Sequence, residues 1–180
     1  YGESDADPFP SGSDGSRDHG THVAGIVASE DATYKGVAPN ASIIAMRIFN
    51  DAGAGNTLWA ISAIDWCVSN STKFNISVIT MSIAITSGGS EVIYSSSCDA
   101  SDGSGLAAAA SAATVSGLFV DASAGNAGNS TGITSPACGE NVTSVGRTDD
   151  DDSVNSGSNS GSILDLFAPG SSVFSTSLSS

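Results

Sequence analysis

The chain has 180 residues, of which 39% are hydrophobic and 13% are charged. These values are typical of a folded globular domain with one sizeable core, and they exclude a wholly disordered chain. The formal net charge of −14 argues against nucleic acid as a partner, because an acidic surface repels phosphate groups. The longest apolar stretch without a charge, residues 106–120, is too short and too rich in Ser and Thr to span a membrane.

The first 18 residues are rich in Asp, Gly, Ser and Pro, which predicts an irregular loop. A short helix is predicted from His19 to about Ala28, with Asp18 as its capping residue. The apolar run from Ser42 to Ile48 predicts a buried strand. The remaining predicted elements, in chain order, are an amphipathic helix 57–69, a buried strand 76–83, an alanine-rich helix 106–116 ended by Gly117, and strands 118–122, 143–147 and 163–167.

Strands that alternate with helices predict a parallel sheet covered by helices. We therefore expect an α/β fold with three α/β/α layers and a mostly parallel sheet. No repeat or linker divides the chain, so residues 1–180 are expected to form one domain. Loops that carry function in such folds lie at the carboxyl ends of the strands.

Three cysteines are present. Cys67 lies in the apolar run of a predicted helix, where a buried thiol is the simplest interpretation. Cys98 and Cys138 lie in polar loop sequence that is compatible with a disulfide, but spacing alone does not choose among the three pairings. No CxxC motif supports a zinc ribbon.

Five N-x-S/T sequons, together with a disulfide that the cysteines could form, favour an extracellular protein. The sequons begin at Asn40, Asn70, Asn75, Asn129 and Asn141. The acidic run 149–152 predicts a loop tip, and a calcium site there is the alternative.

The two histidines, His19 and His22, both lie in Asp-His-Gly-Thr-His-Val-Ala-Gly over residues 18–25. Metal binding, a structural role and general base catalysis compete for them. Residues three apart share a helix face, but HExxH is absent and no third ligand is evident, which argues against zinc. A histidine at a helix start that faces a cleft suits a general base.

This eight-residue segment resembles the histidine signature of the subtilases, a family of serine endopeptidases. The resemblance implies that His19 is the catalytic base and that His22 is a packed structural residue. Gly25 is then expected to allow close packing of the helix on the sheet.

Further segments resemble the same family in register. Lys35–Ala41 resembles the turn into the next strand. Gly53, Ala54 and Gly55 fall where subtilases place an edge segment that pairs with the substrate backbone. Ser82, Ile83 and Ala84 match the opposite substrate segment. The family usually has glycine where Ala84 stands, a difference that bears on the primary specificity pocket.

Ser123, Ala124, Gly125 and Asn126 match the oxyanion segment of subtilases. The resemblance implies that Asn126 donates its side-chain amide to the tetrahedral oxyanion, whereas an isolated Asn after Gly is more often a turn residue. Residues 135–138 and 164–170 also resemble subtilase landmarks, so the resemblance covers roughly residues 19–177. Some subtilases carry a cysteine pair near Cys98 and Cys138, which favours that pairing.

The subtilase triad runs Asp, His, Ser along the chain. Its aspartate belongs to a strand that ends Asp-Ser/Thr-Gly, which residues 1–18 do not contain. The aspartates present there lie in loop sequence and are poor substitutes: Asp5, Asp7, Asp14 and Asp18. Its serine belongs to Gly-Thr-Ser-Met-Ala, just after the region of residues 174–177, and that motif is not in this sequence. We expect a peptidase domain that is incomplete at both ends and inactive as an isolated chain.

The resemblance also implies polypeptide substrates, no cofactor for the chemistry, a structural calcium ion as an option, and a secreted protein; we expect a monomer. Gly128–Gly132 satisfies the G-x-S-x-G pattern of α/β-hydrolases, but no helix start and no histidine follow it, which argues against that enzyme class. A pseudoprotease that keeps a peptide-binding groove is one alternative. A structural cell-surface domain is another, but it does not explain the histidine motif together with Asn126.

Overall fold

The computed structural model describes residues 18–50 and 53–177. The expectations for residues 1–17, including those for Asp5, Asp7 and Asp14, lie outside the described residues. Two compact units make up the chain: Tyr1–Asn56 with Val173–Ser180, and Thr57–Ser172.

Helix α1 (His19–Ala28) belongs to the first unit and has the predicted bounds. The prediction that the Asp18 side chain caps it is wrong, because that side chain makes no capping hydrogen bond. Asp18 has helical backbone angles, φ −84° and ψ −11°, whereas a capping side chain needs an extended backbone to reach the next amides. The carbonyl of Asp18 instead accepts a hydrogen bond from the amide of His22 at 2.7 Å.

The strand predicted over Ser42–Ile48 is also wrong. Residues 42–48 have no strand assignment, and the nearest pairing is a single antiparallel bridge between Phe49 and Gly55. Apolar composition favours an extended chain, but a strand also needs a neighbouring edge that completes its hydrogen bonds. Among the described residues, none provides that edge for this run.

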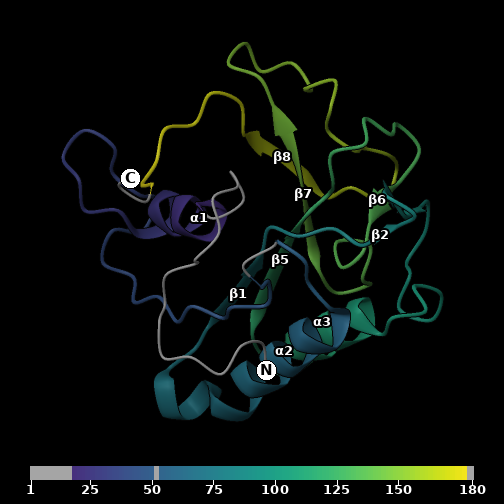
Figure 1. Ribbon diagram of the computed structural model, residues 1–180, viewed down its shortest axis with the longest axis horizontal. Coiled ribbons are helices and arrows are strands. Elements are labelled where there is room, and N and C mark those ends of the chain that lie inside the picture. The colour runs from purple at the N-terminus through teal and green to yellow at the C-terminus, as the bar shows by residue number, and fades with distance from the viewer. Residues whose placement is uncertain (1–17, 51–52, 178–180) are drawn as a thin grey trace. The chain divides into compact units, whose positions relative to one another are not determined.

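The second unit is built around a parallel sheet of four strands in the order β1-β5-β7-β8 (Figure 1). The strands are β1 (Val78–Met81), β5 (Phe119–Ser123), β7 (Thr143–Thr148) and β8 (Leu166–Pro169). All three neighbouring pairs run parallel. The predicted α/β fold with a parallel sheet is therefore confirmed, with β1 shorter than predicted and β8 shifted towards the C-terminus.

Helices α2 (Thr57–Phe74) and α3 (Leu106–Val115) lie side by side, and α3 packs on β5 (Figure 1). Leu106 of α3 and Val120 of β5 are each 1% exposed, so this contact forms part of the core. The predicted end of α3 at Gly117 is confirmed: this residue has φ 99°, and the amides of Gly117 and Leu118 bond back to the carbonyls of Thr114 and Ala113.

Helix α2 continues five residues past its predicted end at Ser69. It ends before Asn75, which has φ 53°, and the amide of Ile76 bonds back to the carbonyl of Ser71 at 2.9 Å. Cys67 on this helix is buried and free, as predicted.

Two small antiparallel pairs complete the second unit. Strands β2 (Thr86–Ser87) and β3 (Ser90–Glu91) form a hairpin, and β4 (Ile93–Tyr94) pairs with β6 (Ile133–Thr134). The hairpin turns at Gly88 and Gly89, with φ 60° and 84°. Two successive positive φ angles are what a two-residue hairpin turn requires.

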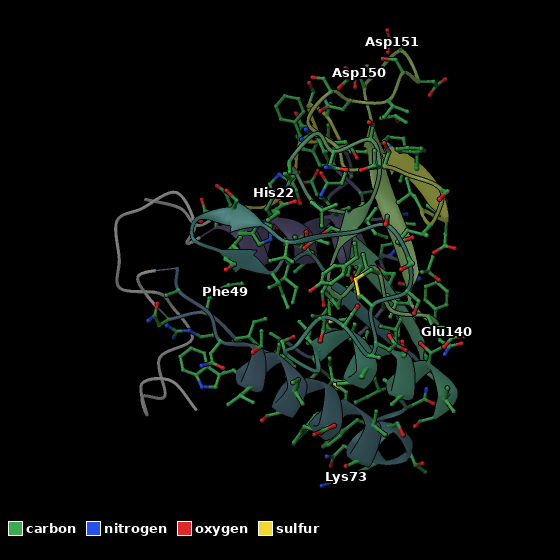
Figure 2. All side chains as sticks on the ribbon, turned by 90° about the vertical axis from the view of Figure 1, so that its right-hand side faces the viewer. His22, Phe49, Lys73, Glu140, Asp150 and Asp151 are labelled. Atoms are coloured by element: carbon green, nitrogen blue, oxygen red, sulfur yellow. A yellow bond between two sulfur atoms is a disulfide. The ribbon has the colours of Figure 1, made fainter. Side chains whose placement is uncertain are left out.

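A disulfide joins Cys98 to Cys138, and Figure 2 shows the bond in yellow. The two Cα atoms are 5.5 Å apart, and the amide of Cys98 donates a hydrogen bond to the carbonyl of Cys138 at 3.0 Å. The bond closes a loop of 40 residues and ties the segment before α3 to the segment after β6.

The acidic run forms a turn between β7 and β8, and Asp150 and Asp151 lie at its tip (Figure 2). The Asp149 carboxylate accepts hydrogen bonds from the Ser171 hydroxyl and the Asn155 amide, which hold the pKa of Asp149 below its usual value. Within residues 18–50 and 53–177, no group of three or more His, Cys, Asp or Glu could hold a metal ion. A structural calcium ion therefore stays a prediction.

None of the described helices combines the length and the hydropathy that crossing a bilayer demands.

Candidate active site

His19 is the first residue of α1 and is exposed. Gly25, about 1.7 turns further along, is the buried residue of this helix. A Cβ atom at Gly25 would overlap the hydroxyl groups of Ser175 and Thr176, so glycine allows residues 175–176 to lie directly against the helix.

Three hydrogen bonds attach this C-terminal segment to the first half of α1. The Ser175 hydroxyl donates to the carbonyl of His22, and the Thr176 hydroxyl to the carbonyl of Thr21, both at 2.7 Å. His22 donates from Nε2 to the carbonyl of Val173 at 3.2 Å. His22 thus has a structural partner, and the segment is fixed beside the helix that begins with His19.

Gly53, Ala54 and Gly55 form a turn in the same unit and are exposed. The amide of Ala54 donates to Oδ1 of Asn50 at 2.9 Å, and its carbonyl accepts from the amide of Asn50 at 3.0 Å. Gly53 has φ 71°, a value that favours glycine. A Cβ atom at Gly55 would come within 2.6 Å of the Phe49 ring.

In the second unit, β1 and β5 are parallel neighbours, with Met81 opposite Ala122. Their carboxyl ends therefore lie at one edge of the sheet, where functional loops gather in α/β folds. Ser82, Ile83 and Ala84 follow β1, and Ala124, Gly125 and Asn126 follow β5. The structure thus brings these two predicted segments together, and a hydrogen bond from Ser123 to the carbonyl of Ile83 links them.

Asn126 is exposed at the start of the loop after β5. Gly125 before it is buried with φ 104°, a conformation that side chains rarely adopt. The backbone amide of Asn126 donates to both carboxylate oxygens of Glu91, at 2.8 and 3.0 Å. Behind the loop, Asn159 is fully buried and bonds to four groups around it.

The hydrogen bonds that Glu91 and Asn159 make with this loop were not foreseen from the sequence. The Gly88-Gly89 pair is a hairpin signal that could have placed Glu91 opposite Thr86, and this pairing is present. Asn159 lies in polar loop sequence, and no local signal distinguishes it from the other asparagines.

A sequence model of the subtilase family matches residues 2–180. The chain belongs to the subtilase family. This subtilase chain is 38% identical over 160 residues to Subtilisin-like protease 5 of Arthroderma otae, covering 87% of the chain and 36% of that protein. It is 35% identical over 179 residues to Subtilisin E of Bacillus subtilis, covering 96% of the chain and 41% of that protein.

A solved structure agrees with the subtilase fold. A cold adapted subtilisin-like serine proteinase superposes with a TM-score of 0.72 and 35% identity, covering 89% of this chain and 51% of that one. The chain spans about half or less of the length of the curated relatives it matches, from 28% to 53%.

Proposed function

We propose that the protein containing this subtilase chain is a serine endopeptidase, with His19 as general base and Asn126 as oxyanion donor. In this mechanism the hydroxyl oxygen of a serine attacks the carbonyl carbon of the scissile peptide bond. His19 takes the hydroxyl proton and later delivers it to the leaving amine. The side-chain amide of Asn126 and a backbone N–H stabilise the negatively charged oxygen of the tetrahedral intermediate.

The observation that best supports this proposal is the attachment of residues 173–176 to α1. By the subtilase resemblance, the nucleophilic serine follows this segment closely. The hydrogen bonds from Ser175 and Thr176 to the first turn of α1 would then hold the chain segment that leads to the nucleophilic serine beside the helix that begins with His19.

We propose that the substrate is an extended polypeptide that binds through its backbone. Gly53, Ala54 and Gly55 would pair with one side of it, and Ser82, Ile83 and Ala84 with the other. Ser123, Ala124 and Gly125 would contact the residue before the scissile bond. Main-chain hydrogen bonds do not depend on the substrate's side chains, so this arrangement suits a protease of broad specificity.

Residues 1–180 are proposed to be part of one peptidase domain and to be inactive on their own. The sequence contains neither Gly-Thr-Ser-Met-Ala nor, before His19, the tripeptide Asp-Ser/Thr-Gly. The match to about half or less of each relative supports this proposal.

The proposal includes an extracellular location, because the disulfide between Cys98 and Cys138 forms and persists in oxidising compartments. The net charge of −14 supports the absence of a nucleic acid partner. The mechanism needs no cofactor, and the protein is proposed to act as a monomer.

Steady-state hydrolysis of a fluorogenic peptide by the full-length protein tests the roles of both residues. His19→Ala is expected to lower kcat by at least about 10⁴-fold. Asn126→Ala is expected to lower it by roughly 10²–10³-fold, the usual effect of losing an oxyanion donor in a subtilisin. Asn141→Ala, a change of an exposed asparagine in another loop, is the matched control and should leave kcat unchanged. Retention of more than a tenth of the activity by His19→Ala would overturn the proposal.

A fluorophosphonate probe tests the isolated chain separately. We expect no labelling of residues 1–180 and stoichiometric labelling of one serine in the full-length protein. Labelling of a single serine within the isolated chain would contradict the proposed inactivity.

A further inference from the structure

Asn159 uses its whole side-chain amide inside the second unit. Its Oδ1 accepts hydrogen bonds from the amides of Ala127 and Asn129, each at 3.0 Å. Its Nδ2 donates to the carbonyl of Ala124 at 3.0 Å and to Oε2 of Glu91 at 2.7 Å. A carboxamide offers two acceptor and two donor positions, so all four are used. The side chain is 0% exposed, so these bonds are shielded from solvent.

Glu91 holds the same loop from the hairpin side. Its two carboxylate oxygens accept the amide hydrogen of Asn126, and Oε2 also accepts from Asn159. Hydrogen bonds to an ionised acceptor are about twice as strong as neutral ones. The register of the β2–β3 hairpin, with Glu91 opposite Thr86, fixes where this carboxylate emerges.

Gly125 shows how closely the loop lies on these two side chains. A Cβ atom at this position would overlap both Nδ2 of Asn159 and Oε2 of Glu91. The carbonyl of Gly125 also accepts a hydrogen bond from the amide of Asn159 at 3.1 Å. The peptide units on both sides of Gly125 are therefore bound to the Glu91–Asn159 pair.

We propose that Glu91 and Asn159 are positioning residues that fix the backbone of residues 124–129 and thereby the direction in which Asn126 presents its side-chain amide. This inference rests on the proposed function of Asn126. An oxyanion donor is effective because it needs no reorganisation when charge develops on the substrate. The Asn126 side chain is exposed, so its direction depends on a backbone that the Glu91 and Asn159 side chains hold in place.

The carboxylate at position 91 and the amide at position 159 can be swapped by two substitutions, Glu91→Gln and Asn159→Asp, and this swap tests the proposal. In Glu91→Gln, an amide NH₂ replaces Oε2, the carboxylate oxygen that accepts from the backbone amide of Asn126 and from Nδ2 of Asn159. In Asn159→Asp, a carboxylate oxygen replaces the NH₂ that faces Glu91 and the carbonyl of Ala124. In the double variant, the new amide at position 91 can donate to the new carboxylate at position 159 and still accept from the backbone amide of Asn126. The carbonyl of Ala124 loses the bond from position 159 and keeps the one from the amide of Thr134. One carboxylate and one amide are restored with reversed polarity.

Steady-state kinetics of the full-length protein measure the effect. Each single variant is expected to lower kcat by roughly tenfold or more, with KM within about twofold of wild type, because the oxyanion donor acts in the transition state. The double variant should recover at least half of the lost factor. Glu140→Gln and Asn141→Asp, matched changes at exposed residues, should leave both constants unchanged. Single variants within about twofold of wild type in kcat, or a double variant worse than both, would overturn the proposal.

The same substitutions in the Asn126→Ala background separate positioning from general stability. If Glu91 and Asn159 act through Asn126, kcat of the Asn126→Ala protein should fall by less than about twofold when either is changed. A further tenfold fall would show that they support the protein in some other way and would overturn the inference.

Hydrogen exchange of the full-length protein, followed by mass spectrometry of peptides covering residues 124–130, is a test that does not use activity. It measures whether Glu91 and Asn159 fix the backbone of residues 124–129. Both single variants should speed exchange of these amides at least about tenfold, and Glu140→Gln should not. Unchanged exchange rates in the Glu91 and Asn159 variants would refute the proposed positioning role, even if the enzyme is active. If Asn126→Ala leaves kcat unchanged while the Glu91 and Asn159 variants exchange faster as expected, the proposed function is refuted and the positioning of the loop is not.

Discussion

The hydroxyl group of Ser123 donates a hydrogen bond to the carbonyl oxygen of Ile83, with 3.1 Å between the two oxygen atoms. Ser123 ends β5, and Ile83 lies just beyond the end of β1. This bond joins two segments that are 40 residues apart in the sequence and that we propose to contact the substrate together. It fixes the spacing of the two segments at the sheet edge where α/β proteins place their sites.

Ser123→Ala is expected to lower kcat/KM for peptide substrates by roughly three- to tenfold, the worth of one hydrogen bond of about 1 kcal/mol. Ser116→Ala is the matched control, because it removes a similar bond from a hydroxyl to a carbonyl, that of Ala112 at the end of α3. The control should leave kcat/KM unchanged. Equal effects of the two substitutions would show that the bond between Ser123 and Ile83 has no special role.

Asp102 organises the start of α3. Its carboxylate accepts hydrogen bonds from the amides of Gly105 and Ala107 and from the hydroxyls of Ser104 and Ser135. Burial raises the pKa of Asp102, but these hydrogen bonds together outweigh burial and hold the pKa below its usual value. Asp102→Asn should lower the free energy of unfolding at pH 7 by about 2 kcal/mol, because an amide replaces an acceptor of several donors.

Urea denaturation at several pH values checks this prediction. The folded pKa of Asp102 is depressed, so its stabilisation is complete above the ordinary pKa of about 3.9 and is lost as the pH falls through the folded pKa. The difference between wild type and Asp102→Asn should therefore be constant from neutral pH to about pH 4 and shrink below it. Asp65→Asn, on the exposed side of α2, serves as the control. A difference that grows towards low pH would contradict this account.

The pKa of Asp121 in β5 is shifted in the opposite direction from that of Asp102. Burial raises the pKa of Asp121, and the hydrogen bond from the Thr80 hydroxyl at 2.8 Å offsets this only in part. The charged carboxylate therefore costs stability above its raised pKa, and this cost disappears as the pH falls below the ordinary value of about 3.9. Asp121→Asn should raise the urea midpoint at pH 7, with a gain that vanishes in acid. Asp150→Asn, at the turn tip, should show no such gain, and a lower midpoint for Asp121→Asn at pH 7 would contradict the prediction.

The disulfide between Cys98 and Cys138 should contribute strongly to the stability of the protein. A closed loop of 40 residues corresponds to about 4 kcal/mol in the chain-entropy description. Replacing both cysteines with alanine should lower the free energy of unfolding by about that amount. Dithiothreitol should shift the urea midpoint of the wild-type protein to that of the variant and leave the variant unchanged. A wild-type midpoint that is insensitive to reductant would argue against the contribution of this bond.

Several elements could be predicted because the signals that define them are local. Helix α3 ends where Gly117 supplies a positive φ, and that glycine is visible in the sequence. The predicted end of α2 comes too early, because residues 69–73 are polar and break the apolar periodicity without stopping the helix. The stop comes from Asn75 in a left-handed conformation, a weaker signal than glycine.

The elements that could not be predicted depend on distant parts of the chain. Residues 42–48 have the composition of a strand, but composition does not supply a pairing partner. The contact between Glu91 and Asn159 joins residues 68 positions apart, and each occurs in polar sequence typical of exposed loops. The motif around Asn126 is recognisable from the sequence, whereas the side chains that hold it in place become visible only in the fold.

We propose that Asn126 and His19 act on the same scissile bond. A crystal structure of the full-length protein with a peptide boronic acid bound to its active serine is the decisive test of this proposal. We expect Nδ2 of Asn126 at about 2.7–3.1 Å from the boronate oxygen that mimics the oxyanion, and the His19 imidazole within hydrogen-bond reach of the same adduct. An adduct in which another residue binds that oxygen, with Asn126 turned away from it or His19 out of reach, would contradict the account.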